Sequence, residues 1–266
     1  MPNPRKRAQA VATAVGVALG CFTLAAPTRD AQAGLLIDLR ITNINGVPVP
    51  AGTKHGVPRF GGAGDTFTID VFAVVSGANA VNDEALRSVT GSFRSTSGGL
   101  LGDLSAALVA PFNGLGSQKG SQVDVDGDGD LDIGPAPTGG PGSAFFLARY
   151  DGPTAYTDGA VVATDPAAEE FRIAQLFFTV TQFEFHPPAF ITFARRQNPD
   201  GSNNLAYAGW NEDGTGTASV RNGESPYAVS GVTIGIPEPG AAALTALASL
   251  GLLARRRRRM REPESL

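Results

Sequence analysis

The sequence predicts an all-β domain, built as a two-sheet sandwich, between an N-terminal signal peptide and a C-terminal apolar helix. The chain of 266 residues holds 34 Gly and 19 Pro, and these residues separate short runs of β-branched and aromatic side chains, which is typical of strands joined by turns. In the clearest strand, 66–75, Phe67, Ile69 and Val71 alternate with polar neighbours. One face of that strand is therefore expected to pack on a core while the other meets water.

Seven further runs have the same composition, and about eight strands favour two packed sheets. Gly231 interrupts the period-two pattern of the last run, which we interpret as a β-bulge. Residues 105–110 are expected to form one short helical turn. The further predicted strands are 35–42, 86–95, 145–148, 171–180, 189–194, 205–209 and 227–236.

The dipeptide Gly64-Asp65 leads into the strand 66–71, and the run 171–180 follows later in the chain. These segments resemble the opening and closing strands of cohesin-type and related carbohydrate-binding sandwiches. The resemblance implies a jelly-roll or cohesin-like architecture, and it says little about a ligand.

The N-terminal residues 1–33 have the features of a secretory signal peptide. Three basic residues, 5–7, precede an apolar stretch, 8–26, and Ala31-Gln32-Ala33 forms a small-residue cleavage site. The secretion translocon is therefore an expected partner. Cys21 offers an alternative, in which the mature protein is an envelope lipoprotein anchored through this cysteine.

The C-terminal residues 236–266 form a second, tripartite segment. Ile236-Pro237-Glu238-Pro239 precedes an uncharged apolar run, 240–254, of fifteen residues. A helix of that length reaches about 22 Å, less than the roughly 30 Å of a hydrocarbon core, so it is short for a permanent span. The basic tail 255–261 follows and favours the cytoplasmic side, with five consecutive arginines, Arg255, Arg256, Arg257, Arg258 and Arg259.

This order of Pro237, Glu238 and Pro239, a short apolar helix and an arginine-rich tail resembles the PEP-CTERM sorting signal. The resemblance covers about the last thirty residues. It implies an exported protein, processed by an exosortase-type enzyme, that is first an inner-membrane-anchored precursor and then reaches the cell surface or extracellular matrix, associated with exopolysaccharide. The alternative is an ordinary C-terminal membrane anchor.

The segment between the two signals, 34–235, is expected to be one domain. Residues 34–239 carry 11 of the 21 Lys and Arg and 22 of the 25 Asp and Glu, a net charge of −11. Such an acidic surface disfavours nucleic acid as a partner. The only cysteine lies in the signal peptide, so no disulfide can stabilise the mature chain.

The segment 124–132 predicts a calcium loop. Repulsion between aspartates at alternate positions is relieved where a hard cation sits among them, and calcium takes six to eight oxygen ligands. In the pattern D-x-D-x-D-G, carboxylates at loop positions one, three and five precede a glycine that permits a sharp turn. The expected metal-binding aspartates are Asp124, Asp126, Asp128, Asp130 and Asp132.

In this loop Asp130 is expected to offer its backbone carbonyl, Leu131 to point into the core, and Asp132 to bind directly or through water. Position twelve is Pro135, which cannot replace the bidentate carboxylate of an EF-hand. The first nine residues resemble the calcium loops of dockerins and of FG-GAP-like β-propeller repeats, which implies bound Ca²⁺. Without a carboxylate at position twelve, either a residue distant in the sequence completes the coordination shell of the ion, or the Kd for calcium is about 10⁻⁴ to 10⁻³ M. The alternative is a solvated acidic turn without an ion.

Catalysis has little support, because the two histidines, His55 and His186, have no metal-binding spacing and no G-x-S-x-G elbow is present. Tyr207 and Trp210 lie among Asn and Gly residues and are candidates for carbohydrate contact. The alternative is that Trp210 packs into the core. We therefore expect a non-enzymatic structural or adhesive protein. The alternative is a secreted glycoside-acting enzyme, whose paired carboxylates would come from Asp83, Glu84, Glu169, Glu170, Glu184, Glu212 or Asp213.

Overall fold

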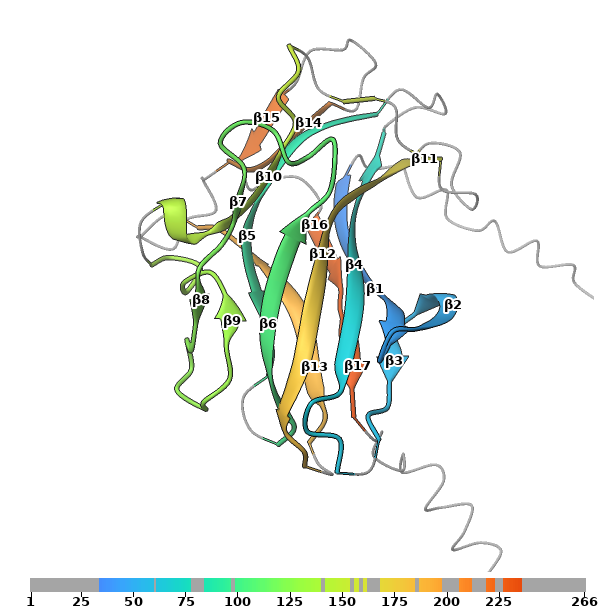
Figure 1. The fold of residues 1–266 in the computed structure, drawn as a ribbon. Coiled ribbons are helices and arrows are strands. Elements are labelled where there is room, and N and C mark those ends of the chain that lie inside the picture. Colours follow the sequence, from blue (N-terminus) through green and yellow to red (C-terminus); the bar gives the residue numbers. More distant parts are fainter. Residues whose placement is uncertain are drawn as a thin grey trace, which may run out of the picture. The chain divides into compact units, whose positions relative to one another are not determined.

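The computed structural model describes the chain over residues 34–59, 61–77, 84–96, 99–139, 142–153, 156–157, 160–161, 168–184, 187–197, 206–211, 219–222 and 227–235. These residues belong to the second of the two units into which the chain divides, Ala31–Leu266. Over the described ranges the chain forms two β-sheets and one 3₁₀ turn, η1 (Gly142–Ala144), with no α-helix (Figure 1). The prediction of an all-β domain with two sheets is confirmed.

The first sheet is seven-stranded and has β4 and β12 at its centre. The strand order is β11-β12-β4-β1-β16, with β2 paired to β1 and β6 paired to β12. All pairs are antiparallel except β1 with β16. The strands are β1 (Gly34–Ile44), β2 (Val47–Thr53), β4 (Thr66–Ser76), β6 (Leu101–Leu108), β11 (Ala160–Val161), β12 (Ala168–Gln182) and β16 (Tyr227–Ser230).

The second sheet is 10-stranded, and four of its strands, β9, β10, β13 and β14, pair directly with β5. Its main order is β15-β14-β5-β13-β17-β3, while β10 and β9 also pair with β5, and β7 and β8 extend these two. The strands are β3 (His55–Gly56), β5 (Ala85–Arg94), β7 (Gln118–Lys119), β8 (Gln122–Val123), β9 (Asp132–Ile133), β10 (Phe146–Arg149), β13 (Ala189–Arg195), β14 (Ala206–Asn211), β15 (Ser219–Asn222) and β17 (Val232–Ile234).

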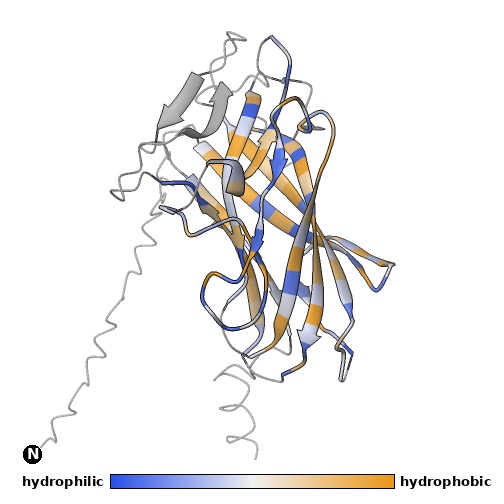
Figure 2. Ribbon diagram, turned by 60° about the vertical axis from the view of Figure 1, so that its left-hand side comes forward, coloured by the Kyte–Doolittle hydropathy of each residue, from blue (hydrophilic) through white to orange (hydrophobic). Residues whose placement is uncertain are grey.

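The inner faces of the two sheets share one hydrophobic core. Along β4 the side chains of Phe67, Ile69 and Val71 are fully buried, as their alternation predicts. Phe93 of the second sheet packs against Phe146 with ring centroids 5.0 Å apart, in an edge-to-face arrangement. The alternation of polar and apolar residues is visible along the long strands in Figure 2. Since no disulfide can form, this core carries the stability of the domain.

Two local predictions are wrong. Residues 105–110 do not form a helical turn, because 101–108 are the strand β6, which pairs with β12 over its whole length. Gly231 is not a bulge within one strand: the chain leaves the first sheet after β16 and joins the second as β17. A side chain at Gly231 would overlap the carbonyl oxygen of Ile191, so the passage of the chain from β16 to β17 requires glycine at this position.

The signal peptide 1–33, the motif at Pro237, Glu238 and Pro239, the run 240–254 and the arginines of 255–261 lie outside the described residues. Cys21 lies outside them as well. In the part of the chain that is described, no helix has the length and apolar character needed to cross a bilayer.

Candidate metal centre

The aspartate-rich loop joins the two short strands β8 and β9, and β9 attaches it to β5. Gln122 and Val123 of β8 pair with Ile133 and Asp132 of β9. Ile133 in turn pairs with Phe93 of β5. The base of the loop therefore belongs to the second sheet, while residues 124–129 are exposed or half-buried.

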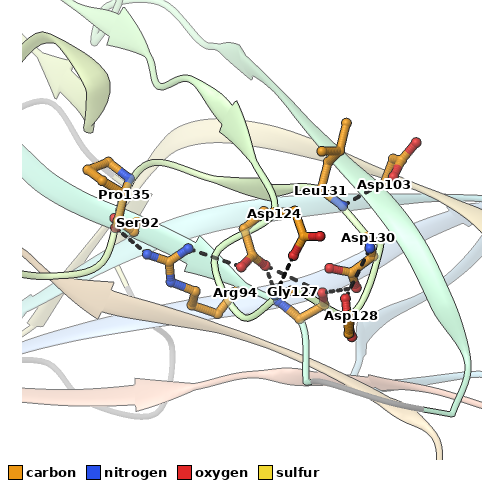
Figure 3. Close-up of polar contacts among 11 residues, drawn as sticks. Ser92, Arg94, Asp103, Asp124, Gly127, Asp128, Asp130, Leu131 and Pro135 are labelled. Atoms are coloured by element: carbon orange, nitrogen blue, oxygen red, sulfur yellow. Dashed lines mark hydrogen bonds and ion pairs between the residues drawn. The ribbon is translucent and has the colours of Figure 1, made fainter. Parts of the chain in front are cut away.

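Three of the five predicted carboxylates converge on one point. Oxygen atoms of Asp124, Asp126 and Asp128 all lie within 4.8 Å of one another. The Asp124 carboxylate accepts hydrogen bonds from the backbone amides of Gly127 (2.7 Å) and Gly129 (3.1 Å), which curl the loop around it (Figure 3). Both glycines have positive φ, +82° and +97°, a conformation that side chains disfavour. The spacing D-x-D-G-D-G thus brings three carboxylates close enough together to serve as ligands of one cation.

The other two carboxylates turn inward toward the end of β5. Asp130 and Asp132 are each 1% exposed. The Ser95 hydroxyl donates to Asp130, while the Ser95 amide donates to Asp132 at 2.9 Å. Arg94 Nη1 forms an ion pair with the Asp132 carboxylate at 3.0 Å. These two side chains therefore anchor the loop, and Asp130 also contacts Asp128 of the group of three.

Burial and neighbouring negative charge make the inner carboxyl groups weak acids. Burial raises the pKa of Asp130 to about 7, the Ser95 hydrogen bond opposes the shift, and the charges of Asp128 and Asp132 add to it. Burial also raises the pKa of Asp132, with the Ser95 amide and Arg94 acting in the opposite direction. A cation placed among these groups would favour their charged forms.

The loop is attached to the first sheet as well, through its contacts with β6. The Leu131 amide donates to the Asp103 carboxylate at 3.1 Å, and the Leu131 carbonyl accepts from the Leu104 amide at 2.7 Å. Gln122 Nε2 donates to the Leu104 carbonyl at 2.6 Å. Leu131 itself is half-buried. Because β5 and β6 belong to different sheets, the loop connects the two layers along one side of the sandwich.

Pro135, at the position where an EF-hand carries its last carboxylate, is also engaged with β5. Its carbonyl oxygen accepts from the Ser92 hydroxyl at 2.8 Å and from Arg94 Nη2. Sequence reasoning missed Ser92, Arg94, Ser95 and Asp103. No spacing along the chain links them to the loop, since they lie on β5 and β6 or directly after β5, and only the fold brings these segments beside the loop.

The remaining candidates are dispersed. Tyr207 and Trp210 lie on β14 in the second sheet, and their side chains are outside the described part of the structure. His55 lies on β3, whereas His186 is not among the described residues. Of the carboxylates that could serve a glycosidase, Glu84 and Glu169 are buried, Glu184 is exposed and Glu170 pairs with Arg40, while Asp83, Glu212 and Asp213 lie outside the described residues.

The fold and loop together define a two-layer β-sandwich with an acidic loop along one side, attached to β5 and β6. No protein family model matches this chain, and no curated protein matches it.

Proposed function

We propose that this chain is an exported surface or extracellular-matrix protein with a non-enzymatic structural or adhesive role, whose sandwich is stabilised by calcium. The observation that carries the calcium part is the convergence of Asp124, Asp126 and Asp128 within 4.8 Å on a loop attached to both sheets. The export part is supported by the residue patterns of 1–33 and 236–266.

The donor set fits calcium. Carboxylate oxygens are the ligands that this hard cation prefers, and a glycine-rich loop can adjust to its irregular coordination. Asp124, Asp126 and Asp128 would hold the ion. Asp130 and Asp132 would serve as anchors, because their side chains are engaged by Ser95 and Arg94. The bound ion would neutralise the repulsion within the loop and favour the folded state.

Because of the position of the loop, a bound ion would have a structural role. On one side the loop is held by β5, through Ser95 and Arg94, and on the other by β6, through Asp103 and Leu104. An ion that fixes the loop therefore fixes the two sheets relative to each other. In a chain with no disulfide, such a link replaces a covalent one.

The PEP-CTERM-like order of the C-terminal segment supports delivery to the cell surface or matrix by an exosortase-type enzyme. The test is the intact mass of the native protein recovered separately from envelope and extracellular fractions. We expect a chain that begins near Gly34 and ends near Pro239. Recovery of a chain that retains residues 255–261 would instead indicate a permanent membrane anchor.

Replacing Glu238 by Gln tests the motif itself, since it removes the charge and keeps the size. We expect this variant to keep its C-terminal arginines, whereas a matched change outside the motif, Glu184→Gln, should be processed as the natural chain is. Lipid labelling that disappears in Cys21→Ala would support the lipoprotein alternative. Hydrolysis of glycosides by the purified chain would support the enzyme alternative.

A further inference from the structure

The outer face of the first sheet, opposite the core, carries polar side chains with two phenylalanine rings among them. On the central strand β4, Phe67, Ile69 and Val71 point into the core, so the intervening Asp70 and Phe72 point outward. On β12 the same alternation buries Phe178 and turns out Phe177, which is 36% exposed. Strands β1 and β12 contribute further outward residues, and Lys54, between β2 and β3, reaches Asp38 of β1.

The strand register arranges this face in three parallel rows. Arg40, Asp70 and Gln175 are cross-strand neighbours and form the middle row. Phe72 lies in the next row on one side, opposite Asp38 and Arg172, and Phe177 lies in the next row on the other side, opposite Thr68. Successive outward residues on a strand are about 6.6 Å apart. Two aromatic rings thus border a polar row.

The middle row is held in place by its own hydrogen bonds. Asp70 Oδ1 accepts from Arg172 Nη2 at 2.7 Å and from Gln175 Nε2 at 2.9 Å. The Arg40 guanidinium lies 4.3 Å from the centre of the Phe72 ring, a cation–π contact. These donors and acceptors therefore have fixed directions before any ligand arrives, which lowers the entropy that binding would cost.

A second set of ion pairs completes the network at its edge. Arg40 donates to Asp38 at 2.7 Å and to Glu170 at 3.0 Å, and Lys54 pairs with Asp38. With the Arg172–Asp70 pair, these ion pairs join three cations and three anions. Their charges cancel, although residues 34–239 as a whole carry −11. This part of the face therefore has no net charge that would favour a charged partner over a neutral one.

We propose that this face binds a neutral polysaccharide. This inference rests on the proposed surface or matrix role and assigns a binding site to it. Sugar hydroxyls can accept hydrogen bonds from Arg172 and Gln175 without breaking the ion pairs, while Asp70, only 7% exposed, holds these two donors in place. The apolar faces of the sugar rings can pack on Phe72 and Phe177, as aromatic side chains combine apolar surface with defined geometry.

A polyanion or a second copy of this chain fits the same face less well. A polyanion would approach a body of net charge −11 and be repelled. A second copy would meet the same repulsion, and it would remove six charged side chains from water, a cost that their mutual attraction often fails to repay. Hydroxyl groups of a sugar instead replace the hydrogen bonds of the water they displace.

Native affinity electrophoresis of the purified full chain tests whether this face binds a neutral polysaccharide. The neutral probes are dextran, hydroxyethyl cellulose and galactomannan, which differ in backbone linkage, and the acidic probe is alginate. We expect at least one neutral probe to retard the chain and alginate to leave its mobility unchanged. Phe177→Ala should weaken the retardation about tenfold, which corresponds to about 1.4 kcal/mol.

Phe190→Ala is the matched control, because Phe190 is 41% exposed on β13 of the other sheet. It should bind as the natural chain does, whereas Gln175→Ala should bind less tightly. Absence of retardation by all three neutral probes, or an equal loss in Phe190→Ala, overturns the proposal. So does concentration-dependent dimerisation that Phe177→Ala abolishes, which would assign the face to a second copy. A chain correctly processed at both termini that fails to bind would refute this site and leave the proposed surface role intact.

Discussion

The backbone amide of Ser95 donates a 2.9 Å hydrogen bond to the carboxylate of Asp132, joining the end of β5 to the start of β9. The same serine donates its hydroxyl to Asp130. One residue of the second sheet thus fixes both inward-facing carboxylates of the aspartate-rich loop. The outer carboxylates, on Asp124, Asp126 and Asp128, are consequently presented together at the loop's exposed end.

Removal of calcium should lower the melting temperature of the full chain. The proposed ion binds the folded loop and not the unfolded chain, so its loss removes a stabilisation that grows with ion concentration, about 2.7 kcal/mol at 100 times Kd. Differential scanning calorimetry in EGTA and in millimolar calcium would measure the difference.

Asp126→Asn should abolish most of the calcium effect, because it removes a converging carboxylate. Asp151→Asn is the control, since Asp151 is an exposed aspartate outside this loop, and it should respond to calcium as the natural chain does. An identical melt with and without calcium would exclude a structural ion.

The calcium-free protein should lose stability as the pH rises from about 4 to about 7. Burial and neighbouring charges raise the pKa of Asp130 from 3.8 to about 7 in the folded state. Over that interval the unfolded carboxyl group gives up its proton while the folded one retains it, so the unfolded state is increasingly favoured. Urea unfolding of the full chain in EGTA at pH 5 and pH 8 would measure the change.

Asp130→Asn provides the control, because an amide cannot ionise yet can still accept the hydrogen bond from Ser95. We expect this variant to be more stable than the natural chain at pH 8 in EGTA, with a smaller dependence on pH. A pH dependence unchanged by the substitution would assign it to other groups.

Arg94→Ala should destabilise the domain by about 3–5 kcal/mol, the usual cost of removing one partner from a buried ion pair. The substitution leaves the Asp132 carboxylate buried without its cation and removes the hydrogen bond to the Pro135 carbonyl. Urea unfolding gives the free energy of unfolding. In an Asp132→Asn background the same substitution should cost clearly less, and additive effects of the two changes would contradict this coupling.

Gly231→Ala should destabilise the domain by about 1–3 kcal/mol, because overpacking forces neighbouring atoms to shift. The added methyl group would overlap the Ile191 carbonyl oxygen, which belongs to the backbone of β13 and cannot rotate away. Gly139→Ala is the matched control, since its nearest contact would be 3.6 Å, an ordinary distance. The melting temperature of Gly231→Ala should be lower than that of Gly139→Ala. Equal melting temperatures would argue against close packing where the chain passes from β16 to β17.

Much of the strand content could be predicted because alternation is a local signal. The alternating run 66–75 corresponds to β4, and the predicted strand 86–95 corresponds to β5. The helical turn expected at 105–110 failed because the helix propensity of its Ala and Leu residues is a weak preference, and pairing with β12 decided the conformation. Short strands such as β8 and β9 carry too few residues for a period to appear.

In the candidate site, too, some features follow from local spacing and others depend on the fold. The convergence of Asp124, Asp126 and Asp128 follows from spacing, because glycines at 127 and 129 allow the loop to close on itself. The inward turn of Asp130 and Asp132 could not be predicted, since their partners are 35 or more residues away along the chain. Only the pairing of β9 with β5 brings these residues together.

The sequence by itself determined the all-β class, the alternating strands and the acidic loop, because each depends on residues close together in the chain. The tertiary structure alone decided which sheet each strand joins, where the chain crosses at Gly231, and how the loop is held between β5 and β6. It also placed Phe72 and Phe177 on either side of one polar row. These features depend on contacts between distant segments, whose energies come from burial and cross-strand pairing that no local pattern encodes.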